Sequence, residues 1–139
     1  MKCDVEIKKT SIRVPSELKY IREVSSKILD NLASYGVASD SLFDIRLCTE
    51  EAVRNAIVHG NKLSKNASVN VSYWVENNTL NIEIEDEGSG FKPEDVPDPT
   101  LDDNIMRNSG RGVYLIKKLM DRVDFSKSGN KIKMEKSLK

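Results

Sequence analysis

A β-hairpin is predicted by the stretch VNVSYWVENNTLNIEI, residues 69–84. Its apolar side chains alternate with polar ones on both sides of Asn77 and Asn78, and an Asn pair favours a tight turn between antiparallel strands. One face of the hairpin should therefore be buried. Another layer of structure has to cover that face.

Apolar periodicity predicts the elements before the hairpin. An edge strand is expected from Val5 to Val14, closed by Pro15. An amphipathic helix should follow, with Ser16 as its N-cap and Gly36 at its end. A second helix is expected from about residue 39 to residue 60, with a wide apolar stripe along one side.

The chain after the hairpin predicts a long loop, a helix and two strands. Residues 91–109 contain several prolines and acidic residues without periodicity, so we expect a lid or a disordered loop there. A third helix should follow Gly112, and strands are expected around residues 123–125 and 132–134. Residues 1–139 are thus predicted to form one α+β domain, a two-layer sandwich with helices on one face of a mostly antiparallel mixed sheet.

Composition excludes several classes of protein. The 139 residues include 22 basic and 22 acidic side chains, so the chain lacks the positive charge of a general nucleic-acid binder. It has no apolar run long enough for a membrane span and no apolar core of a secretory signal, so we expect a cytoplasmic protein. Cys3 and Cys48 lie far apart, and His59 is the only histidine, which disfavours a zinc site. We expect Cys48 to be a small buried residue.

Three polar residues of the second helix share one spacing. Glu51, Asn55 and His59 fall at i, i+4 and i+8, which places them along one stripe of an α-helix. A carboxylate beside an amide oxygen suits Mg²⁺ with substrate phosphates, and the carboxylate could also accept a proton from an attacking hydroxyl. A solvated polar face would show the same spacing.

Two glycine-rich segments could contact a nucleotide. A strand breaks at residue 86 into DEGSG, where Asp86 could accept a hydrogen bond from an exocyclic amine and the glycines allow a close backbone approach. Gly110 and Gly112 precede a predicted helix, whose free N–H groups would bind phosphates. Each segment alone also fits an ordinary turn or cap.

Together these segments resemble the motifs of the GHKL superfamily of ATPases, and most closely those of the small anti-sigma-factor serine/threonine-protein kinases. The helix motif, the Asp-x-Gly-x-Gly motif and the Gly-x-Gly motif occur in that order. They comprise Glu51, Asn55, Ala56, His59 and Gly60; Asp86, Gly88 and Gly90; and Gly110 and Gly112.

The resemblance implies a role for each motif. It implies that Glu51 is the general base, that Asn55 holds Mg²⁺ and that Asp86 reads the adenine amino group of ATP. Gly88 and Gly90 would shape the pocket floor, and the amides from Gly110 to Gly112 would bind phosphates. His59 would be a structural pocket residue rather than a phosphoacceptor.

Two positions depart from the family pattern. A basic residue expected near the terminal phosphate is replaced by Asn108, and Arg107 or Arg111 could substitute for it. A Gly-Thr pair that helps to seat adenine is replaced by Gly129 and Asn130, and Asn can both donate and accept.

Three functions therefore stay open. The leading hypothesis is a kinase that phosphorylates a small antagonist protein and sequesters a sigma factor, with homodimers as in many family members. The second is a switch module that binds ATP or ADP and a partner but does little chemistry. The third is a scaffold that has lost nucleotide.

Overall fold

The structure is a computed structural model that describes residues 6–64, 66–88 and 108–138, with the side chains of α4 described from Gly112 onward. Short 3₁₀ turns cover Leu18–Tyr20 and Ala33–Tyr35, and a π-helical turn covers Ala56–Gly60. The main elements are β1 (Ile7–Pro15), α1 (Ile21–Leu32), α2 (Ser39–Asn55), β2 (Ser68–Glu76), β3 (Thr79–Glu85), α4 (Asn108–Leu119), β4 (Arg122–Phe125) and β5 (Lys131–Ser137).

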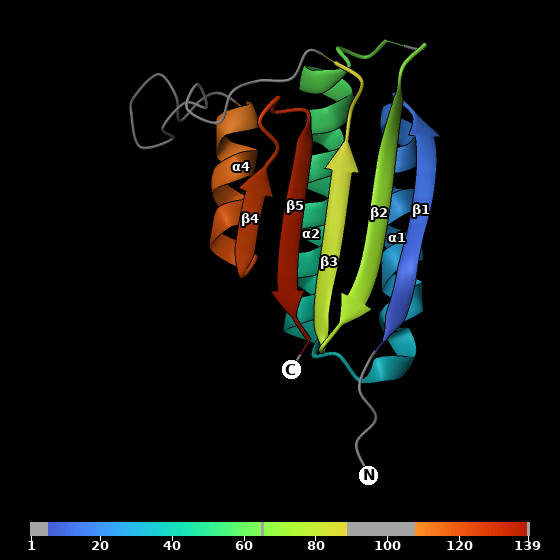
Figure 1. The fold of residues 1–139 in the computed structure, drawn as a ribbon, viewed down its shortest axis with the longest axis vertical. Helices are drawn as coiled ribbons and strands as arrows, with labels where there is room; N and C mark the ends of the chain where they lie inside the picture. The colour runs from blue at the N-terminus through green and yellow to red at the C-terminus, as the bar shows by residue number, and fades with distance from the viewer. Residues whose placement is uncertain (1–5, 65, 89–107, 139) are drawn as a thin grey trace.

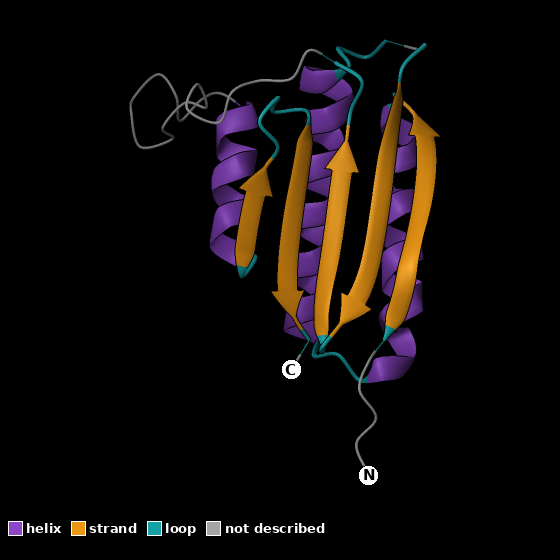
Figure 2. Cartoon of the chain, in the orientation of Figure 1, coloured by secondary structure: helices purple, strands orange, loops and turns teal. Residues whose placement is uncertain are grey.

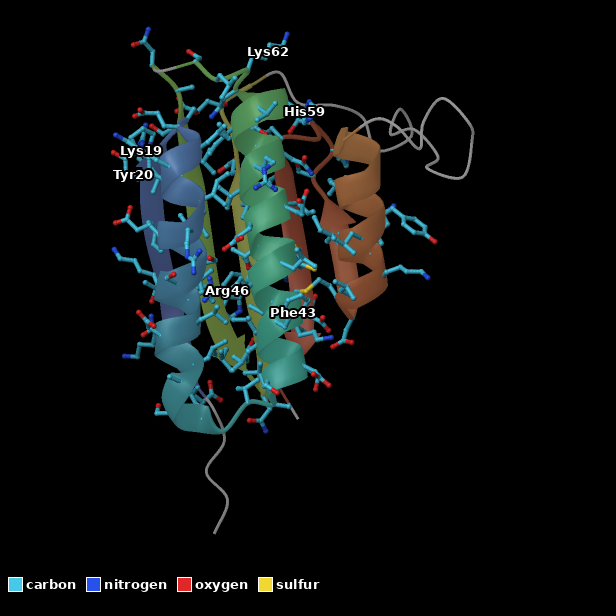
Figure 3. The ribbon with its side chains drawn as sticks, turned by 180° about the vertical axis from the view of Figure 1, so that it is seen from behind. Lys19, Tyr20, Phe43, Arg46, His59 and Lys62 are labelled. Carbon is cyan, nitrogen blue, oxygen red and sulfur yellow. The ribbon has the colours of Figure 1, made fainter. Side chains whose placement is uncertain are left out.

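The strands form one five-stranded sheet in the order β1-β2-β3-β5-β4. Every neighbouring pair in this order is antiparallel. Figure 1 shows α1, α2 and α4 behind the sheet, and Figure 2 shows the two layers, helices in one and strands in the other. Seen from the other side, the helices lie in front of the strands (Figure 3). The predicted α+β sandwich with helices on one face is confirmed.

The hairpin forms where its sequence predicts. Asn77 and Asn78 both have positive φ, 54° and 58°, which is the backbone of the tight turn that matches strand twist. β2 and β3 pair from Glu76 opposite Thr79 to Asn70 opposite Glu85. The alternating apolar residues of both strands are almost completely buried: Val69, Val71, Tyr73, Val75, Leu80, Ile82 and Ile84.

The helices supply the layer over this apolar face. Val24, Ile28 and Leu32 of α1 are buried in the core, as are Ile45 and Val53 of α2. Cys48 is also buried as a free cysteine, as predicted. No helix in the described part of the chain is both long and apolar enough to span a membrane.

Two helix starts differ from the sequence predictions. Ser16 is not an N-cap: its hydroxyl donates to the carbonyl of Ala67 at 2.9 Å, and the helical chain begins with a 3₁₀ turn at Leu18. The second difference is at α4, which begins at Asn108, so Gly110 and Gly112 lie within its first five residues rather than before it. Asn108 and Ser109, which the sequence predicted as loop, thus belong to α4, and residues 89–107 lie outside the described chain.

Candidate nucleotide-binding site

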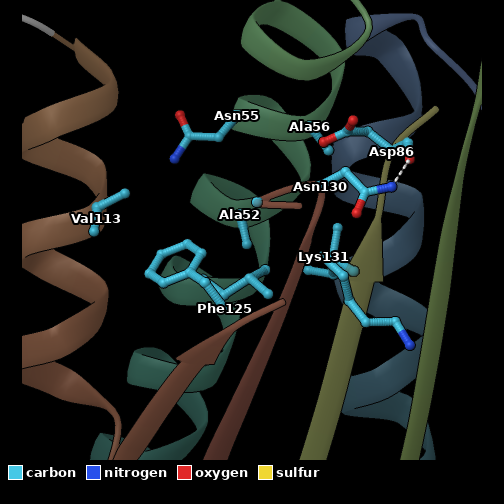
Figure 4. A pocket seen from close by; sticks show the side chains of 11 residues that line it. Ala52, Asn55, Ala56, Asp86, Val113, Phe125, Asn130 and Lys131 are labelled. Carbon is cyan, nitrogen blue, oxygen red and sulfur yellow. Dashed lines mark hydrogen bonds between the residues drawn. The ribbon is translucent and has the colours of Figure 1, made fainter. Parts of the chain in front are cut away.

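A cavity opens between α2, α4 and the adjoining ends of β3, β4 and β5. Its volume is about 30 Å³, which is below the usual size of a small-molecule site, and it is partly open to solvent. Figure 4 shows Asp86 and Asn130 together on one side of the cavity, with Phe125 and Val113 on another. The lining residues are Ala52, Asn55, Ala56, Ile84, Asp86, Val113, Phe125, Gly129, Asn130, Lys131 and Ile132.

Asp86 is the buried carboxylate of this cavity. It directly follows β3 and is 7% exposed. Oδ1 accepts the N–H of Gly88 at 2.8 Å, whereas Oδ2 accepts no hydrogen bond from the described residues. Burial raises the pKa of Asp86 above its ordinary value; the Gly88 N–H lowers this pKa and the neighbouring charge of Glu85 raises it further. One carboxylate oxygen is thus left to accept a hydrogen bond from a ligand.

Asn130 holds the backbone at Asp86 in register. The Asp86 N–H donates to the Asn130 carbonyl at 2.9 Å, and Nδ2 of Asn130 donates back to the Asp86 carbonyl at 3.2 Å (Figure 4). Oδ1 of Asn130 accepts from the hydroxyls of Ser126 and Ser128. The residue that stands in place of the family threonine therefore lines the cavity and ties its floor to the β4–β5 turn.

Two glycines allow close backbone approaches around Asp86. A Cβ atom on Gly60 would overlap the carboxylate of Asp86, and one on Gly88 would overlap the main-chain carbonyl of Gly60. Neither overlap can be relieved without moving Asp86 or the backbone. The π-helical turn, which ends at Gly60, and the turn that follows Asp86 thus fit together only with glycine at both positions.

Glu51 and Asn55 meet α4 at Gly112. A Cβ atom on Gly112 would lie 2.7 Å from Oε2 of Glu51 and 3.2 Å from Nδ2 of Asn55. Oε1 of Glu51 accepts from Nη1 of Arg54 at 2.7 Å, which leaves Oε2 directed toward α4. Asn55 also lines the cavity, so Asn55 and the buried carboxylate of Asp86 border the same space, whereas Glu51 is one turn away on α2 and is not among the lining residues.

His59 departs from the stripe expected on this helix. α2 is α-helical only as far as Asn55, and residues 56–60 form a π-helical turn with more residues per turn. His59 is exposed and is absent from the residues that line the cavity. Figure 3 shows His59 near the end of this helical segment, close to the labelled Lys62.

Several predicted site residues lie partly or wholly outside the described chain. Gly90 and Arg107 are not described, and Gly110 and Arg111 are described only as part of α4. Because α4 begins at Asn108, its free N–H groups come from the residues just before Gly112.

Sequence reasoning missed the apolar walls of the cavity. Phe125 ends β4 and lines the cavity with Val113 of α4 and Ala52 of α2. Each of these residues was predicted only as part of a strand or an apolar helix stripe. Their only signal in the sequence is that they are apolar, and only the packing of α4 beside β4 places them at this cavity.

The family of this chain follows from its whole sequence. The profile of the histidine kinase-like ATPase domain matches residues 14–136. The chain therefore belongs to the histidine kinase-like ATPase domain family, which confirms the resemblance of its three motifs.

The chain is also similar to individual proteins whose activity is named. The chain is 29% identical over 136 residues to the serine-protein kinases RsbW of Staphylococcus aureus strains JH9 and Newman, covering 92% of this chain and 86% of each relative. A crystal structure of the RsbU and RsbW domains of a Mycobacterium tuberculosis protein matches with a TM-score of 0.63 and 16% identity, over 94% of this chain. This chain spans 32% of that longer protein, and the likeness shows the shared fold.

Proposed function

We propose that this protein is an ATP-binding anti-sigma factor and a serine/threonine-protein kinase that phosphorylates a small antagonist protein. The observation that carries the proposal is the shared cavity. Asp86, a buried carboxylate, borders it on one side, and Asn55, next to Glu51, borders it on another. ATP requires two kinds of contact: a group that binds the adenine base, here Asp86, and polar groups that face the phosphates, here Asn55 and Glu51.

The lining of the cavity offers suitable contacts to the base of ATP. Oδ2 of Asp86 is available to accept a hydrogen bond from the amino group of adenine, while the Gly88 N–H holds Oδ1. Phe125 and Val113 offer apolar surface to the purine ring. Guanine would present a carbonyl oxygen where adenine has its amine, and this oxygen would face a carboxylate. The site should therefore prefer ATP to GTP.

The phosphate side of the site is formed by α2 and the start of α4. The amide oxygen of Asn55 is a hard ligand that suits Mg²⁺, and the free N–H groups of the first turn of α4 suit phosphate oxygens. Bound Mg²⁺ would neutralise charge on the phosphates. Arg107 and Arg111 are the candidates in this sequence for contact with the terminal phosphate.

Glu51 is the proposed general base. Its side chain is 22% exposed, so a substrate hydroxyl can reach it, and Arg54 holds one of its two oxygens. Oε2 would accept the proton of a serine or threonine hydroxyl as the hydroxyl oxygen attacks the γ-phosphorus of ATP. The bond from that phosphorus to the β–γ bridging oxygen would break, and ADP would leave. Positioning and charge stabilisation supply most of the acceleration in phosphoryl transfer, and the base adds to them.

The relatives support a kinase over the switch module. The Staphylococcus aureus proteins are named serine-protein kinases, and the match covers 92% of this chain. We propose that the protein has two partners: a sigma factor that it sequesters and an antagonist protein that it phosphorylates. A cytoplasmic homodimer that regulates transcription is part of the same proposal.

Phosphate transfer to a candidate antagonist in the presence of ATP and Mg²⁺ tests the proposal. The Glu51→Gln variant should bind ATP with normal affinity but lose most of the transfer rate. The matched control is Glu50→Gln, because Glu50 lies beside Glu51 in sequence but accepts a hydrogen bond from Ser25 of α1. Full transfer by Glu51→Gln would refute the role of Glu51, and absence of ATP binding by the wild-type protein would refute the whole proposal.

A further inference from the structure

A buried asparagine outside the recognised motifs connects four parts of the chain. Asn61 follows the π-helical turn and is 5% exposed. Its Nδ2 donates to Oγ of Ser16 at 2.7 Å and to the carbonyl of Ser68 at 2.9 Å, and its Oδ1 accepts the N–H of Glu87 at 2.7 Å. Its own N–H donates to the carbonyl of Ala56 at 2.8 Å. Figure 3 labels Lys62, the next residue, at this end of the helical layer.

The partners of Asn61 lie where three strands begin or end. Ser16 follows β1, Ser68 begins β2 and Glu87 lies two residues after the end of β3. The network is further closed because the hydroxyl of Ser16 donates to Ala67 and the N–H of Ser68 donates to the carboxylate of Glu87. One amide side chain therefore uses both donors and its acceptor on segments far apart in sequence.

The contact with Glu87 places this network next to Asp86, the residue proposed to bind the adenine base. Glu87 lies between Asp86, whose carboxylate lines the cavity, and Gly88, whose N–H holds that carboxylate. The turn is held from both sides: Asn61 binds the N–H of Glu87, and Ser68 binds its carboxylate. Gly60 packs directly against the carboxylate of Asp86. A shift of the turn would therefore move the Asp86 carboxylate, which lines the cavity.

We infer that Asn61 is a positioning residue for nucleotide selectivity, and that it acts with Glu87 to set the orientation of the Asp86 carboxylate toward the purine base. This inference rests on the proposed ATP-binding function. Asn61 itself does not line the cavity, so it acts through the Asp86 turn. Its removal should change the preference for ATP over GTP, since Asp86 distinguishes the two bases, while the phosphate contacts stay unchanged.

Calorimetric titration of the full chain with ATP and with GTP tests the inference. Asn61→Ala should weaken ATP binding about tenfold while GTP binding changes by less than about twofold, because one hydrogen bond to a buried charged group corresponds to roughly that factor. The kinetic counterpart is a KM for ATP that rises about tenfold with kcat nearly unchanged. An equal loss for both nucleotides would overturn the inference and leave only a structural role.

A second variant avoids the loss of a buried side chain. Glu87 is exposed, so Glu87→Ala should fold, and it removes only the carboxylate contact with Ser68 and an ion pair with Arg13. It should reduce the ATP-to-GTP affinity ratio about threefold. An unchanged ratio in Glu87→Ala would overturn the inference even if Asn61→Ala fails to fold.

Two controls separate this inference from its alternatives. Asn81→Ala removes another buried asparagine, on β3 near the hairpin turn, where Nδ2 donates to the carbonyl of Thr79. It should lower stability without changing the affinity ratio. If the wild-type protein binds neither nucleotide, the proposed function fails; if the wild-type protein prefers ATP and Asn61→Ala keeps that preference, only the role of Asn61 fails.

Discussion

Gly112 lies so close to Glu51 that a Cβ atom in place of its hydrogen would stand 2.7 Å from Oε2 of that residue. The same atom would lie 3.2 Å from Nδ2 of Asn55. The two functional side chains of α2 therefore depend on the absence of a side chain on α4. The glycine that the sequence suggests for phosphate binding also makes room for the proposed base.

Gly112→Ala should leave the fold stable but reduce phosphate transfer. Alanine normally stabilises a helix by about 0.5–1 kcal/mol relative to glycine, and the atom it meets is the end of a flexible side chain, so the fold should tolerate it. Glu51 must then turn away, and phosphate transfer should fall at least about tenfold. Thermal unfolding and transfer assays measure the two effects. The double variant Gly112→Ala with Glu51→Gln should transfer no more slowly than Glu51→Gln alone; additive losses would contradict this mechanism.

Asp86→Asn should stabilise the protein while weakening ATP binding. The pKa of Asp86 is raised in the folded state, so the folded chain holds this proton to higher pH than the unfolded chain. The contribution of this group to stability is therefore lost as pH rises from the ordinary value of 3.8 through the raised pKa, and the ionised group is a cost at neutral pH. Removing the charge should raise the unliganded Tm by about 2 °C or more.

The same substitution should weaken ATP binding about tenfold to a hundredfold, since the Gly88 N–H will select the amide oxygen and leave the NH₂ group facing the adenine amine. The check is differential scanning calorimetry with and without ATP, which should show a higher Tm alone and a much smaller shift on adding ATP. A lower Tm without ATP would contradict the cost assigned to the buried charge.

Local signals predicted the elements well. The alternation around Asn77 and Asn78 specifies both the strands and the turn, because side-chain direction in a strand depends only on sequence spacing. Ser16 shows the limit of such signals. It occupies a typical N-cap position, yet its hydroxyl bonds Ala67 and Asn61, whose proximity depends on the completed sheet.

Part of the candidate site could be predicted from the sequence motifs. Asn55 and Asp86 line one cavity, whereas the path of the chain between Asn55 and His59 depends on a π-helical turn that no local pattern signalled. That turn is closed by the N–H of Asn61 on the carbonyl of Ala56, and Gly60 packs against Asp86. The first contact is local to the π-helical turn and the second is tertiary, and no residue spacing signals either, so neither the exposure of His59 nor the network of Asn61 could be derived from spacing.

Thr49→Val should stabilise the protein without affecting activity. Thr49 is fully buried on α2, and its hydroxyl has no hydrogen-bond partner in the described part of the chain. Valine has nearly the same shape and removes the unsatisfied group, so the free energy of unfolding should rise by about 1 kcal/mol. Urea unfolding measures this change. Thr49→Ser is the control, since it keeps the hydroxyl and loses a methyl group, and it should be destabilised. A destabilised valine variant would mean that a buried water serves the hydroxyl.

Cys48 should resist thiol reagents in the folded protein. It is fully buried, and burial raises its pKa from 9.0 to about 12; the charge of Asp44 adds to the rise and that of Lys136 opposes it. Because the thiolate is the reactive form, labelling in a Cys3→Ser background should be slow until the chain unfolds. Slow labelling at pH 8 that becomes complete in urea is the expected result, and rapid native labelling would show that the helix layer opens locally.

Because the pKa of Cys48 is raised, its contribution to the stability of the protein should decrease at alkaline pH. The folded state keeps the Cys48 proton while the unfolded state loses it above pH 9.0, so the contribution of this group is complete below that pH and is lost as pH rises toward 12. The slope should approach about 1.4 kcal/mol per pH unit. Cys48→Ala lacks this titration, so the stability advantage of the wild-type protein over the variant should shrink between pH 9 and pH 11. Unfolding measured in parallel for the two proteins cancels the other alkaline groups, and a constant difference would place the thiol in contact with water.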